Sequence, residues 1–404
     1  MNDPVRGKGQ TPGDEAQFHS SSPGPSVLMV LGMFHPIIGG AELQAQRLAG
    51  ALSARGVSVE VVTSRQKGTA DREKINGLPV VRVGVPGWLR LGRIKFYCLQ
   101  TAVFLYILRC GHRFEVIHVH GAGYLAWAAL AAARLLRLPI LVKGLNSGHK
   151  FDLTELIETF RFGRIMASHL VHRVSMFIAT TPAMAEAFIA AGVAAGRVTL
   201  IPNGVVSQGT SDPEPASAPH PYPVIGFVGS LYPSKNLPLL VEALARLKKD
   251  GLNFKLLLVG DGPERERLVK SAGNLDMEDR LEITGYVQDV ENYLSRLDIF
   301  VLPSPAEGLS NALLEAMAAG LACVAMDIPA NRAVLENGRN GLLVPLSAGV
   351  SGLAQELARL LESPDLRHRL GDQARETIRT GFSMDMVAQR YVQLYGSLSA
   401  GKNR

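Results

Sequence analysis

Short runs of apolar residues recur along this chain, and each precedes a stretch in which apolar residues repeat about every 3.6 positions. Residues 27–31 form the first run, Leu43, Leu48 and Leu52 mark the helical stretch after it, and residues 57–62 form the second run. Uninterrupted apolar runs of this length are typical of strands buried on both faces of a parallel sheet. The opening of the chain therefore predicts a strand–helix–strand unit, the building block of an α/β domain.

The same alternation continues through the first half of the chain. It predicts further strands at residues 79–83, 116–120, 140–142, 177–180 and 198–201, and helices at about 96–109, 123–137, 153–170 and 182–191. The composition then changes at residues 207–223, where five prolines replace the large apolar residues. This change predicts a linker between two domains, as expected for a chain of 404 residues.

The second half repeats the strand–helix pattern. Strands are predicted at residues 224–229, 255–260, 281–284, 299–302, 322–325 and 341–344, with helices between them and a last helix at about 384–398. We therefore predict an α/β protein with two doubly wound, Rossmann-like domains facing a cleft. The expected parts are a disordered tail at 1–24, an N-terminal domain at 25–206, a linker at 207–223, a C-terminal domain at 224–380, and a helix at 381–404 that crosses back to the N-terminal domain. Ligands of such sheets bind at the carboxyl ends of the strands.

Cysteine usage and charge narrow the class of protein. Cys98, Cys110 and Cys323 have no metal-ligand spacing, so a reducing compartment is predicted instead of a disulfide framework or zinc site. The net charge is +6, but residues 1–210 hold 22 Lys and Arg against 12 Asp and Glu, whereas residues 211–404 hold 20 against 24. The excess of basic residues in the first half predicts that this half contacts an anionic partner. Because no nucleic-acid-binding signature is present, we expect a membrane surface or a phosphorylated acceptor and no nucleic acid.

Two stretches bear on location. The first 24 residues lack the apolar segment of a signal peptide, and no run reaches the roughly 18 apolar residues of a membrane span, so the sequence predicts a cytoplasmic protein. Residues 88–108 are the most apolar stretch, punctuated by Arg90, Arg93 and Lys95. They fit a core helix with a basic exposed face, or a helix that touches the inner membrane surface, and the sequence alone leaves both open.

One segment places two carboxylates around the predicted start of a helix. Glu307 lies in the loop after the strand at 299–302, and Glu315 lies about two turns into the next helix, which ends at Gly320. The backbone N–H groups between them have no intrahelical partner and carry the positive end of the helix dipole. This arrangement suits a sugar diphosphate, with amides for phosphate and carboxylates for hydroxyls. Spacing alone favours the alternative, an amphipathic helix with solvated charges, and the rest of the chain reverses that preference.

Further motifs accompany this segment in a fixed order. The first half contains Gly-Gly-Ala-Glu at 39–42, His-Val-His at 118–120 and Ile-Pro-Asn-Gly-Val at 201–205, and the second contains characteristic loops at 228–237, 259–264, 285–287 and 307–315. Each motif alone is unspecific, but the ordered set over residues 26–395 resembles the family 4 glycosyltransferases, which are retaining enzymes of the GT-B fold. The resemblance implies a nucleotide-sugar donor and places the acceptor on the N-terminal domain.

The resemblance also implies roles at the donor site. Glu315 would accept hydrogen bonds from the ribose hydroxyls, Glu307 would contact the sugar or stabilise positive charge on it, and Lys235 would place a positive charge on the departing diphosphate. Ser230 departs from the family, where an arginine usually accompanies the lysine, so a phosphate donor is lost unless Arg265 or another base replaces it. The other donor-binding residues would be Gly39, Gly40, Gly262, Leu309, Ser310 and Asn311, while Glu42 is expected to cap its helix.

Two histidines are the acceptor-side candidates. Alternation puts His118 and His120 on one face of their strand, where one can be buried while the other faces the cleft. The resemblance implies that His120 lies near the transferred sugar as a catalytic residue and that His118 supports it. Lys143, Asn146 and Ser147 follow the next strand and are further candidates for binding the acceptor.

The predicted chemistry is transfer of a sugar from a nucleotide to a saccharide or lipid-linked acceptor, in cell-surface polysaccharide or glycolipid synthesis. The family implies retention by front-face attack. Lys235 and the helix N-termini can stabilise the leaving group without a metal, and no Asp-x-Asp motif ends a strand, so neither metal nor cofactor is expected. Alternatives are a catalytically weak sugar-nucleotide-binding protein, and an epimerase or glycogen-type polymerase of the same fold. A Rossmann dehydrogenase is disfavoured because no Gly-x-Gly-x-x-Gly follows either leading strand.

Overall fold

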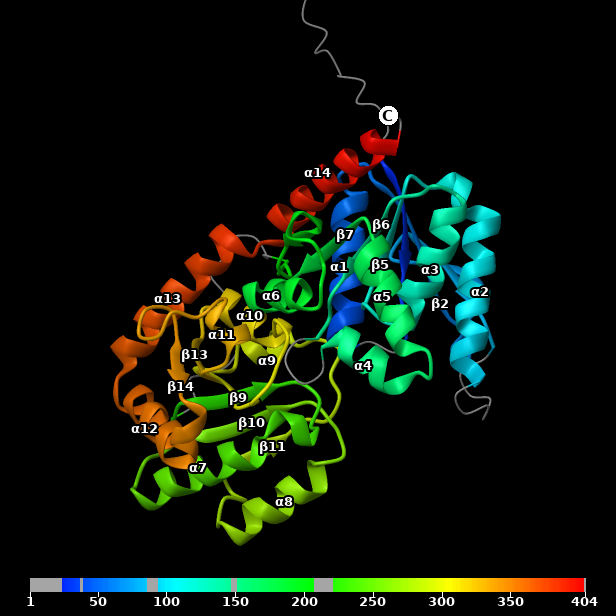
Figure 1. Ribbon diagram of the computed structural model, residues 1–404. Coiled ribbons are helices and arrows are strands. Elements are labelled where there is room, and N and C mark those ends of the chain that lie inside the picture. The colour runs from blue at the N-terminus through cyan, green and yellow to red at the C-terminus, as the bar shows by residue number, and fades with distance from the viewer. Residues whose placement is uncertain (1–23, 37–38, 86–93, 147–150, 207–220, 403–404) are drawn as a thin grey trace, which may run out of the picture.

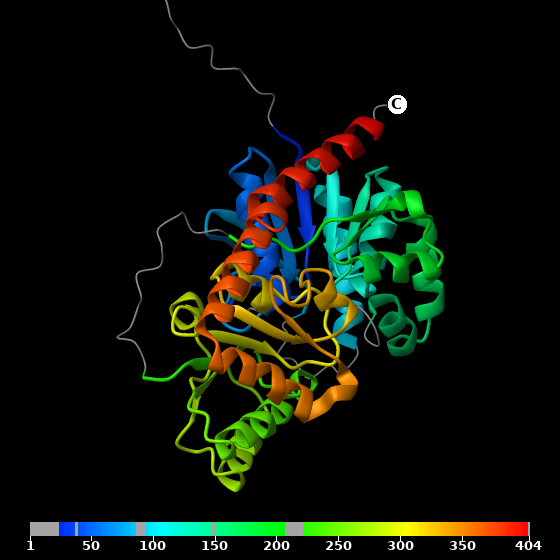
Figure 2. The same cartoon turned by 90° about the vertical axis from the view of Figure 1, so that its left-hand side faces the viewer.

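Two parallel sheets, each with helices on both faces, form the protein (Figures 1 and 2). The computed structural model describes residues 24–36, 39–85, 94–146, 151–206 and 221–402. The predicted α/β class with two doubly wound domains is confirmed. Most of the predicted tail, and residues 207–220 of the predicted linker, lie outside the described residues.

The first sheet has the strand order β3-β4-β2-β1-β5-β6-β7-β8. All neighbouring strands are parallel except β3 and β4. The chain order reverses between β1 and β5, so the loops that follow these two strands diverge and leave a crevice at their carboxyl ends. The strands are β1 (Ser26–Val30), β2 (Ser58–Ser64), β3 (Arg72–Ile75), β4 (Leu78–Val83), β5 (Val116–His120), β6 (Ile140–Lys143), β7 (Met176–Ala179) and β8 (Val198–Leu200).

Apolar cores lie on both faces of this sheet. Helices α2 (Ile94–Cys110), α3 (Tyr124–Leu135), α4 (Asp152–Thr159), α5 (Gly163–Arg173) and α6 (Pro182–Ala190) contribute to one core. Helix α1 (Gly40–Ser53) and the last helix, α14 (Met384–Lys402), contribute to the other, where Tyr391 and Tyr395 join Leu48 and Leu52. The C-terminal helix therefore completes the core of the first domain, beside α1 (Figure 2).

The second sheet has the order β11-β10-β9-β12-β13-β14, and all its neighbouring strands are parallel. Its reversal lies between β9 and β12. The strands are β9 (Val224–Val228), β10 (Lys255–Val259), β11 (Leu281–Ile283), β12 (Ile299–Leu302), β13 (Ala322–Met326) and β14 (Leu342–Val344). The helices are α7 (Leu237–Lys249), α8 (Arg265–Asn274), α9 (Glu291–Leu294), α10 (Asn311–Ala318), α11 (Pro329–Arg332), α12 (Gly349–Glu362) and α13 (Pro364–Gly381).

The chain crosses between the domains at two places that pair with each other. The Val205 amide donates to the Phe382 carbonyl at 2.9 Å, and the Met384 amide donates to the Val205 carbonyl at 2.8 Å. Gly204 allows this approach, because a Cβ there would lie 2.8 Å from the Met384 Cα. Gln44 of α1 donates to the Gly204 carbonyl at 2.8 Å. Both crossings are thus tied to the helix that opens the first domain.

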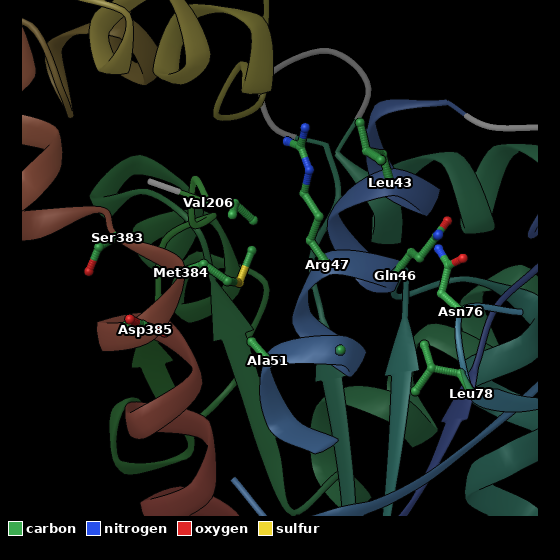
Figure 3. Close-up of a pocket in the computed structure, with 11 residues that line it drawn as sticks. Leu43, Gln46, Arg47, Ala51, Asn76, Leu78, Val206, Ser383, Met384 and Asp385 are labelled. Atoms are coloured by element: carbon green, nitrogen blue, oxygen red, sulfur yellow. The ribbon is translucent and has the colours of Figure 1, made fainter. Parts of the chain in front are cut away.

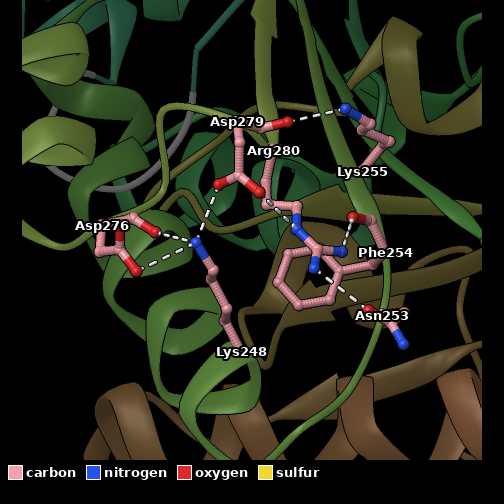
Figure 4. Close-up of polar contacts among 7 residues, drawn as sticks. All are labelled: Lys248, Asn253, Phe254, Lys255, Asp276, Asp279 and Arg280. Carbon is pink, nitrogen blue, oxygen red and sulfur yellow. Dashed lines mark hydrogen bonds and ion pairs between the residues drawn. The ribbon is translucent and has the colours of Figure 1, made fainter.

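Charged residues also gather at the amino ends of β10 and β11, opposite the crevice (Figure 4). Lys248 of α7 contacts Asp276 and pairs with Asp279 at 2.8 Å. Arg280 donates to the Phe254 carbonyl at 3.1 Å. These contacts join α7 to the loops that precede the two strands, so they are structural contacts remote from the carboxyl ends.

The structure differs from the prediction at two elements. Strand β3 was not predicted because its residues are mostly charged, although Asn76 and Gly77 have φ of 49° and 81° and connect β3 to β4 as a two-residue hairpin. Asn-Gly is a strong signal for such a turn. The single helix predicted at 153–170 is wrong, because the chain breaks into α4 and α5 at Phe160. The Phe160 ring packs 6.2 Å from Phe96 of α2 and 5.6 Å from Tyr124 of α3, a tertiary contact that local periodicity does not encode.

Candidate functional site

The loops after β9 and β12 bring the two predicted catalytic charges together. Lys235 ends a 3-10 turn at Pro233–Lys235, and Asn236 follows with φ of 52° before α7 begins. The Lys235 Nζ lies 2.5 Å from the Glu307 Oε1, and their side chains are 26% and 12% exposed. The adjacency of the β9 and β12 loops explains why residues 72 positions apart form one ion pair.

Close backbone packing shapes the neighbouring donor-site loops. A Cβ at Gly262 would lie 2.6 Å from the Leu231 carbonyl oxygen, and one at Gly260 would lie 2.0 Å from that of Gly229. Glycine is therefore required here because the loops after β9 and β10 touch through their backbones. Ser230 is exposed between them. Helix α8 begins at Arg265, so Pro263 belongs to the turn that precedes the helix.

The start of α10 is the second part of the predicted donor site. The Ser310 Oγ accepts a hydrogen bond from the Leu313 amide at 3.3 Å, as an N-cap does. The Asn311 Nδ2 donates to the Gly40 carbonyl at 2.7 Å, and the Asn311 Oδ1 accepts from the Asn203 Nδ2 at 2.9 Å. Asn203 also donates to the Leu309 carbonyl at 3.2 Å. The start of α10 therefore meets the start of α1 across the domain interface.

The start of α1 has the cap that the sequence predicted. The Gly39 amide donates to the Glu42 Oε2 at 3.0 Å, which confirms the capping expectation for Glu42. A Cβ at Gly40 would lie 3.1 Å from the Asn311 Nδ2. The absence of a side chain at Gly40 thus lets Asn311 of the second domain approach the N-terminus of α1.

Arg47 is a site residue that the sequence analysis missed. Its guanidinium, from α1, forms an ion pair with Glu315 of α10, and the two side chains are 27% and 12% exposed. Arg265, the expected replacement for the family's arginine, instead lies 3.7 Å from Asp261. Glu315 is the fifth residue of α10, so it lies one turn into the helix and not two. Arg47 follows Gly40 by seven residues, and this two-turn spacing was a usable signal that it shares the face of α1 near the cleft.

The carboxyl ends of β5 and β6 hold three buried basic side chains. His118 is fully buried, as expected for one of the two histidines, and His120 is 7% exposed. Their rings stack with centroids 4.3 Å apart because both point to the same side of the strand. The His118 Nδ1 lies 2.8 Å from the Tyr395 hydroxyl of α14. The Lys143 Nζ donates to the Asn203 Oδ1 at 2.8 Å.

Burial sets the charge state of this cluster. It lowers the pKa of His118 to about 3, with the Lys143 charge adding to the effect. It also lowers the pKa of His120 well below its usual value, helped by His118 and Lys143. The pKa of Lys143 falls to about 8 for the same reason. Both imidazoles are therefore neutral at physiological pH, and the described residues offer no hydrogen-bond partner to either Nε2 atom.

Asp152 organises the acceptor-side loops and was also missed. Its carboxylate accepts hydrogen bonds from the amides of Ala122, Leu145 and Asn146 at 2.9, 3.0 and 3.0 Å. Burial raises the pKa of Asp152 although these three bonds act to lower it. An aspartate at the start of α4 was the only sequence signal. Asn146 is thus held through its backbone, and Ser147 lies outside the described residues.

A pocket of about 770 Å³ opens beside Glu307. Its walls come from both domains and are largely apolar: α4 and α6 on one side, and the loops after β12 and β13 on the other. Among the described residues, no group of three or more His, Cys, Asp or Glu is placed to hold a metal ion. No helix in the described part of the chain has the length and hydropathy needed to cross a bilayer.

Comparison with known proteins gives matches to two families. Residues 39–204 match the glycosyl transferase 4-like domain, and residues 210–377 match the glycosyl transferases group 1. A curated relative, the lipopolysaccharide core biosynthesis glycosyltransferase LpsE of Rhizobium meliloti (strain 1021), is 32% identical over 175 residues, which are 43% of this chain and 50% of that protein. The chain thus spans about half the length of this relative.

Solved structures share the architecture. Sucrose-phosphate synthase from Thermosynechococcus elongatus aligns with a TM-score of 0.76 at 22% identity, covering 93% of this chain and all of the other. Anabaena HepE, solved in complex with UDP-glucose, aligns with a TM-score of 0.73 at 20% identity, covering 92% of this chain and all of that one. At this level of identity the likeness concerns the fold. Taken with the two family matches, it shows that the chain belongs to the family 4 glycosyltransferases of the GT-B fold, the glycosyl transferases group 1.

Proposed function

We propose that this protein is a retaining, metal-independent hexosyltransferase. It transfers a sugar from a nucleotide-sugar donor to a saccharide or lipid-linked acceptor in cell-surface polysaccharide or glycolipid synthesis. The observation that carries the proposal is the Lys235–Glu307 pair, which lies where the second sheet reverses its strand order, facing the pocket that both domains line. The name of LpsE, a lipopolysaccharide core biosynthesis glycosyltransferase, supports this class of acceptor. The complex of HepE with UDP-glucose supports this class of donor.

The leaving nucleoside diphosphate develops negative charge as the glycosidic bond lengthens. Lys235 supplies a fixed positive charge, and the N-termini of α1 and α10, at Gly40 and Asn311, supply backbone N–H groups. Groups that are oriented before the reaction stabilise this charge without reorganisation. In this proposal the cations and dipoles of the chain take the part that a metal plays in other transferases.

The donor would lie along the start of α10. Glu315 accepts hydrogen bonds from the two ribose hydroxyls, and the amides of Leu309, Ser310 and Asn311 bind the phosphates and sugar. Gly39, Gly40, Gly262 and Ser230 would complete the donor site. Glu307 contacts the sugar and stabilises the positive charge that builds on it. Because Lys235 neutralises Glu307 in the ion pair, donor binding exchanges this partner for the diphosphate.

His120 would stand near the transferred sugar, with the stacked His118 as its support. A neutral imidazole can share hydrogen bonds with sugar hydroxyls without competing as a cation for the diphosphate. The acceptor would occupy the pocket beside Glu307 and attack from the same face that the leaving group departs. Lys143 would act on the acceptor only through the loop that it holds, since it is 4% exposed. Asn146 is exposed and would bind the acceptor directly.

Contact with an anionic membrane surface is part of the proposal. Exposed apolar and basic side chains occur together where α2 begins and α5 begins, and Phe160 packs against Tyr97 between them. The set comprises Ile94, Lys95, Tyr97, Arg161, Phe162, Arg164 and Ile165. Apolar side chains flanked by basic ones suit the inner, anionic face of a membrane. We expect co-sedimentation with anionic but not with neutral liposomes, and equal recovery on both would contradict the electrostatic contact.

The deciding experiment is thermal denaturation with UDP, GDP and ADP, followed by an assay of nucleotide release from the matching sugar donor. One nucleotide should raise the melting temperature of the wild type and of Glu376→Ala, an exposed control on α13 that pairs with Arg379. Glu315→Ala should abolish the shift, and Glu307→Ala should abolish nucleotide release. A shift without release would favour the sugar-nucleotide-binding alternative, and no shift with any nucleotide would refute the donor site.

A further inference from the structure

Helices α1 and α10 meet along one face through two polar contacts. Gly40 and Arg47 are seven residues apart on α1, and their partners Asn311 and Glu315 are four residues apart on α10. Both spacings keep the residues on one side of their helices. The two helices come from different domains. Asn311 joins their N-termini, and the Arg47–Glu315 ion pair joins them again one turn farther along α10.

Figure 3 shows how Arg47 reaches this position. Its side chain leaves α1 at the rim of a pocket of about 370 Å³, which Leu43, Ala51, Leu78 and Met384 help to line, and the guanidinium lies at the end far from Ala51. The aliphatic stem therefore covers apolar surface while the charge extends to the other domain. The pocket itself is largely apolar.

The contact leaves Glu315 able to bind a second partner. One guanidinium nitrogen, Nη1, meets one carboxylate oxygen, Oε1. An ionised carboxylate has about four acceptor positions, so Oε2 and part of Oε1 stay available to hydroxyl groups. At 12% exposure, the Glu315 side chain has little solvent to stabilise its charge or fix its direction. Without Arg47 the carboxylate would be partly buried and uncompensated, a costly state.

We propose that Arg47 is a positioning residue of the donor site, which holds the Glu315 carboxylate in the orientation that the donor ribose needs. The inference rests on the proposed function, because it takes ribose as the ligand of Glu315. It adds that donor affinity depends on a side chain of the acceptor-side domain. Ribose binding and contact between the domains are then coupled, since Arg47 reaches Glu315 only while α1 and α10 face each other.

The test measures nucleotide affinity in a double-mutant cycle of Arg47→Met and Glu315→Gln. Methionine keeps the apolar stem and removes the charge. UDP, GDP and ADP are each titrated into the wild type, and the one that binds is used throughout, with inorganic pyrophosphate as the ligand that lacks ribose. We expect Arg47→Met to weaken nucleotide binding about tenfold, and the double variant to bind no more weakly than Glu315→Gln alone. Pyrophosphate affinity should be the same in all four proteins.

Two further variants control for charge and folding. Arg55→Met removes a guanidinium from the turn that follows α1. Arg55 pairs at 2.9 Å with Asp385, whose side chain is 82% exposed, so this variant should leave both affinities unchanged. Arg47→Lys keeps the charge and should restore most of the nucleotide affinity. The proposal is overturned if Arg47→Met binds the nucleotide as tightly as the wild type while Glu315→Gln does not, if the two effects add, or if pyrophosphate affinity falls equally. A wild type that binds no nucleotide would refute the donor site itself.

Discussion

The two sides of the cleft hold their titratable side chains in opposite ways. On the C-terminal side, Lys235 and Glu307 are partly exposed and neutralise each other. On the N-terminal side, His118, His120 and Lys143 are buried, and burial favours their neutral forms by lowering each pKa. The C-terminal side therefore presents charges that a ligand can redirect, and we call it the charged side. The N-terminal side presents two uncharged imidazoles next to the buried Lys143, and we call it the neutral side after these imidazoles.

This difference fits a division of work in glycosyl transfer. A departing diphosphate needs fixed positive charge close to it, whereas the sugar needs hydrogen-bonding groups that do not compete for that charge. The C-terminal side offers the first through Lys235, and the N-terminal side offers the second through neutral imidazoles. Variants on the C-terminal side should therefore change activity, whereas removal of Lys143 on the N-terminal side should change how stability depends on pH.

The largest effect is expected on the charged side. Lys235→Met removes the cation from the diphosphate and leaves the Glu307 carboxylate without this partner. Removal of one oriented group that stabilises transition-state charge typically lowers kcat about 10²- to 10³-fold. We expect a loss of this size in kcat for sugar transfer, measured at saturating donor by steady-state kinetics. The melting temperature should change much less, because the pair is partly exposed.

The matched control is Lys248→Met in the same domain. Lys248 contacts Asp276 and Asp279 at the opposite end of the sheet (Figure 4). This lysine also belongs to an ion-pair cluster, but it is remote from the loops after β9 and β12. Its substitution should leave kcat within about twofold of the wild type. An equal loss of kcat in both variants would show that the effect of Lys235 is structural.

The sequence predicted the charged side better than the neutral side. Lys235, Glu307 and Glu315 lie in loops after strands or one turn into a helix, so the order of strands and motifs is enough to place them at one sheet edge. Their partners were harder to predict. Arg47 pairs with Glu315 over 268 positions, and only the packing of α1 on α10 brings them together.

The neutral side depends on contacts that local patterns do not encode. Strand alternation correctly put His118 and His120 on one face, but it did not reveal that Tyr391 and Tyr395 of α14 pack against His118. Those tyrosines follow the histidines by more than 270 positions. The break at Phe160 has the same origin, because aromatic packing against α2 and α3 overrides helical periodicity.

On the neutral side, burial lowers the pKa of Lys143 from 10.5 to about 8. Between these two pH values the unfolded chain keeps the proton that the folded protein has released, so wild-type stability rises with pH through this window. Below pH 8 the cost of burying the ammonium is fully present, and above 10.5 it is absent. The stability of Lys143→Met relative to the wild type should therefore fall by about 3 kcal/mol from neutral pH to pH 10.5.

Urea denaturation at a series of pH values measures this change, and the lost hydrogen bond to Asn203 shifts all points by the same amount. Lys74→Met, at an exposed position of β3, controls for the general effect of removing a lysine. Its stability relative to the wild type should show no such slope between pH 8 and 10.5. A flat difference for Lys143→Met would mean that its ammonium is not desolvated, and the contrast between the two sides would weaken.

The smallest effect separates two buried tyrosines on the neutral side. The Tyr395 hydroxyl lies 2.8 Å from the His118 Nδ1, whereas the Tyr391 hydroxyl has no hydrogen-bond partner among the described residues. Both side chains are fully buried. Tyr395→Phe should therefore cost about 1 kcal/mol of unfolding free energy, because it leaves His118 without this partner. Tyr391→Phe removes an unpaired polar atom and should be neutral or stabilising.

The same pair of variants tests whether His118 supports His120. If the Tyr395 hydrogen bond fixes the His118 ring, and the stacked His118 fixes His120, Tyr395→Phe should lower kcat several-fold while donor KM stays unchanged. Tyr391→Phe should leave both constants unchanged, since it makes no bond to the histidines. Equal kinetics in the two variants, with the stability difference intact, would show that His118 only packs the helix α14 against the sheet. The two buried histidines would then have a structural role, and catalysis would depend on the charged side alone.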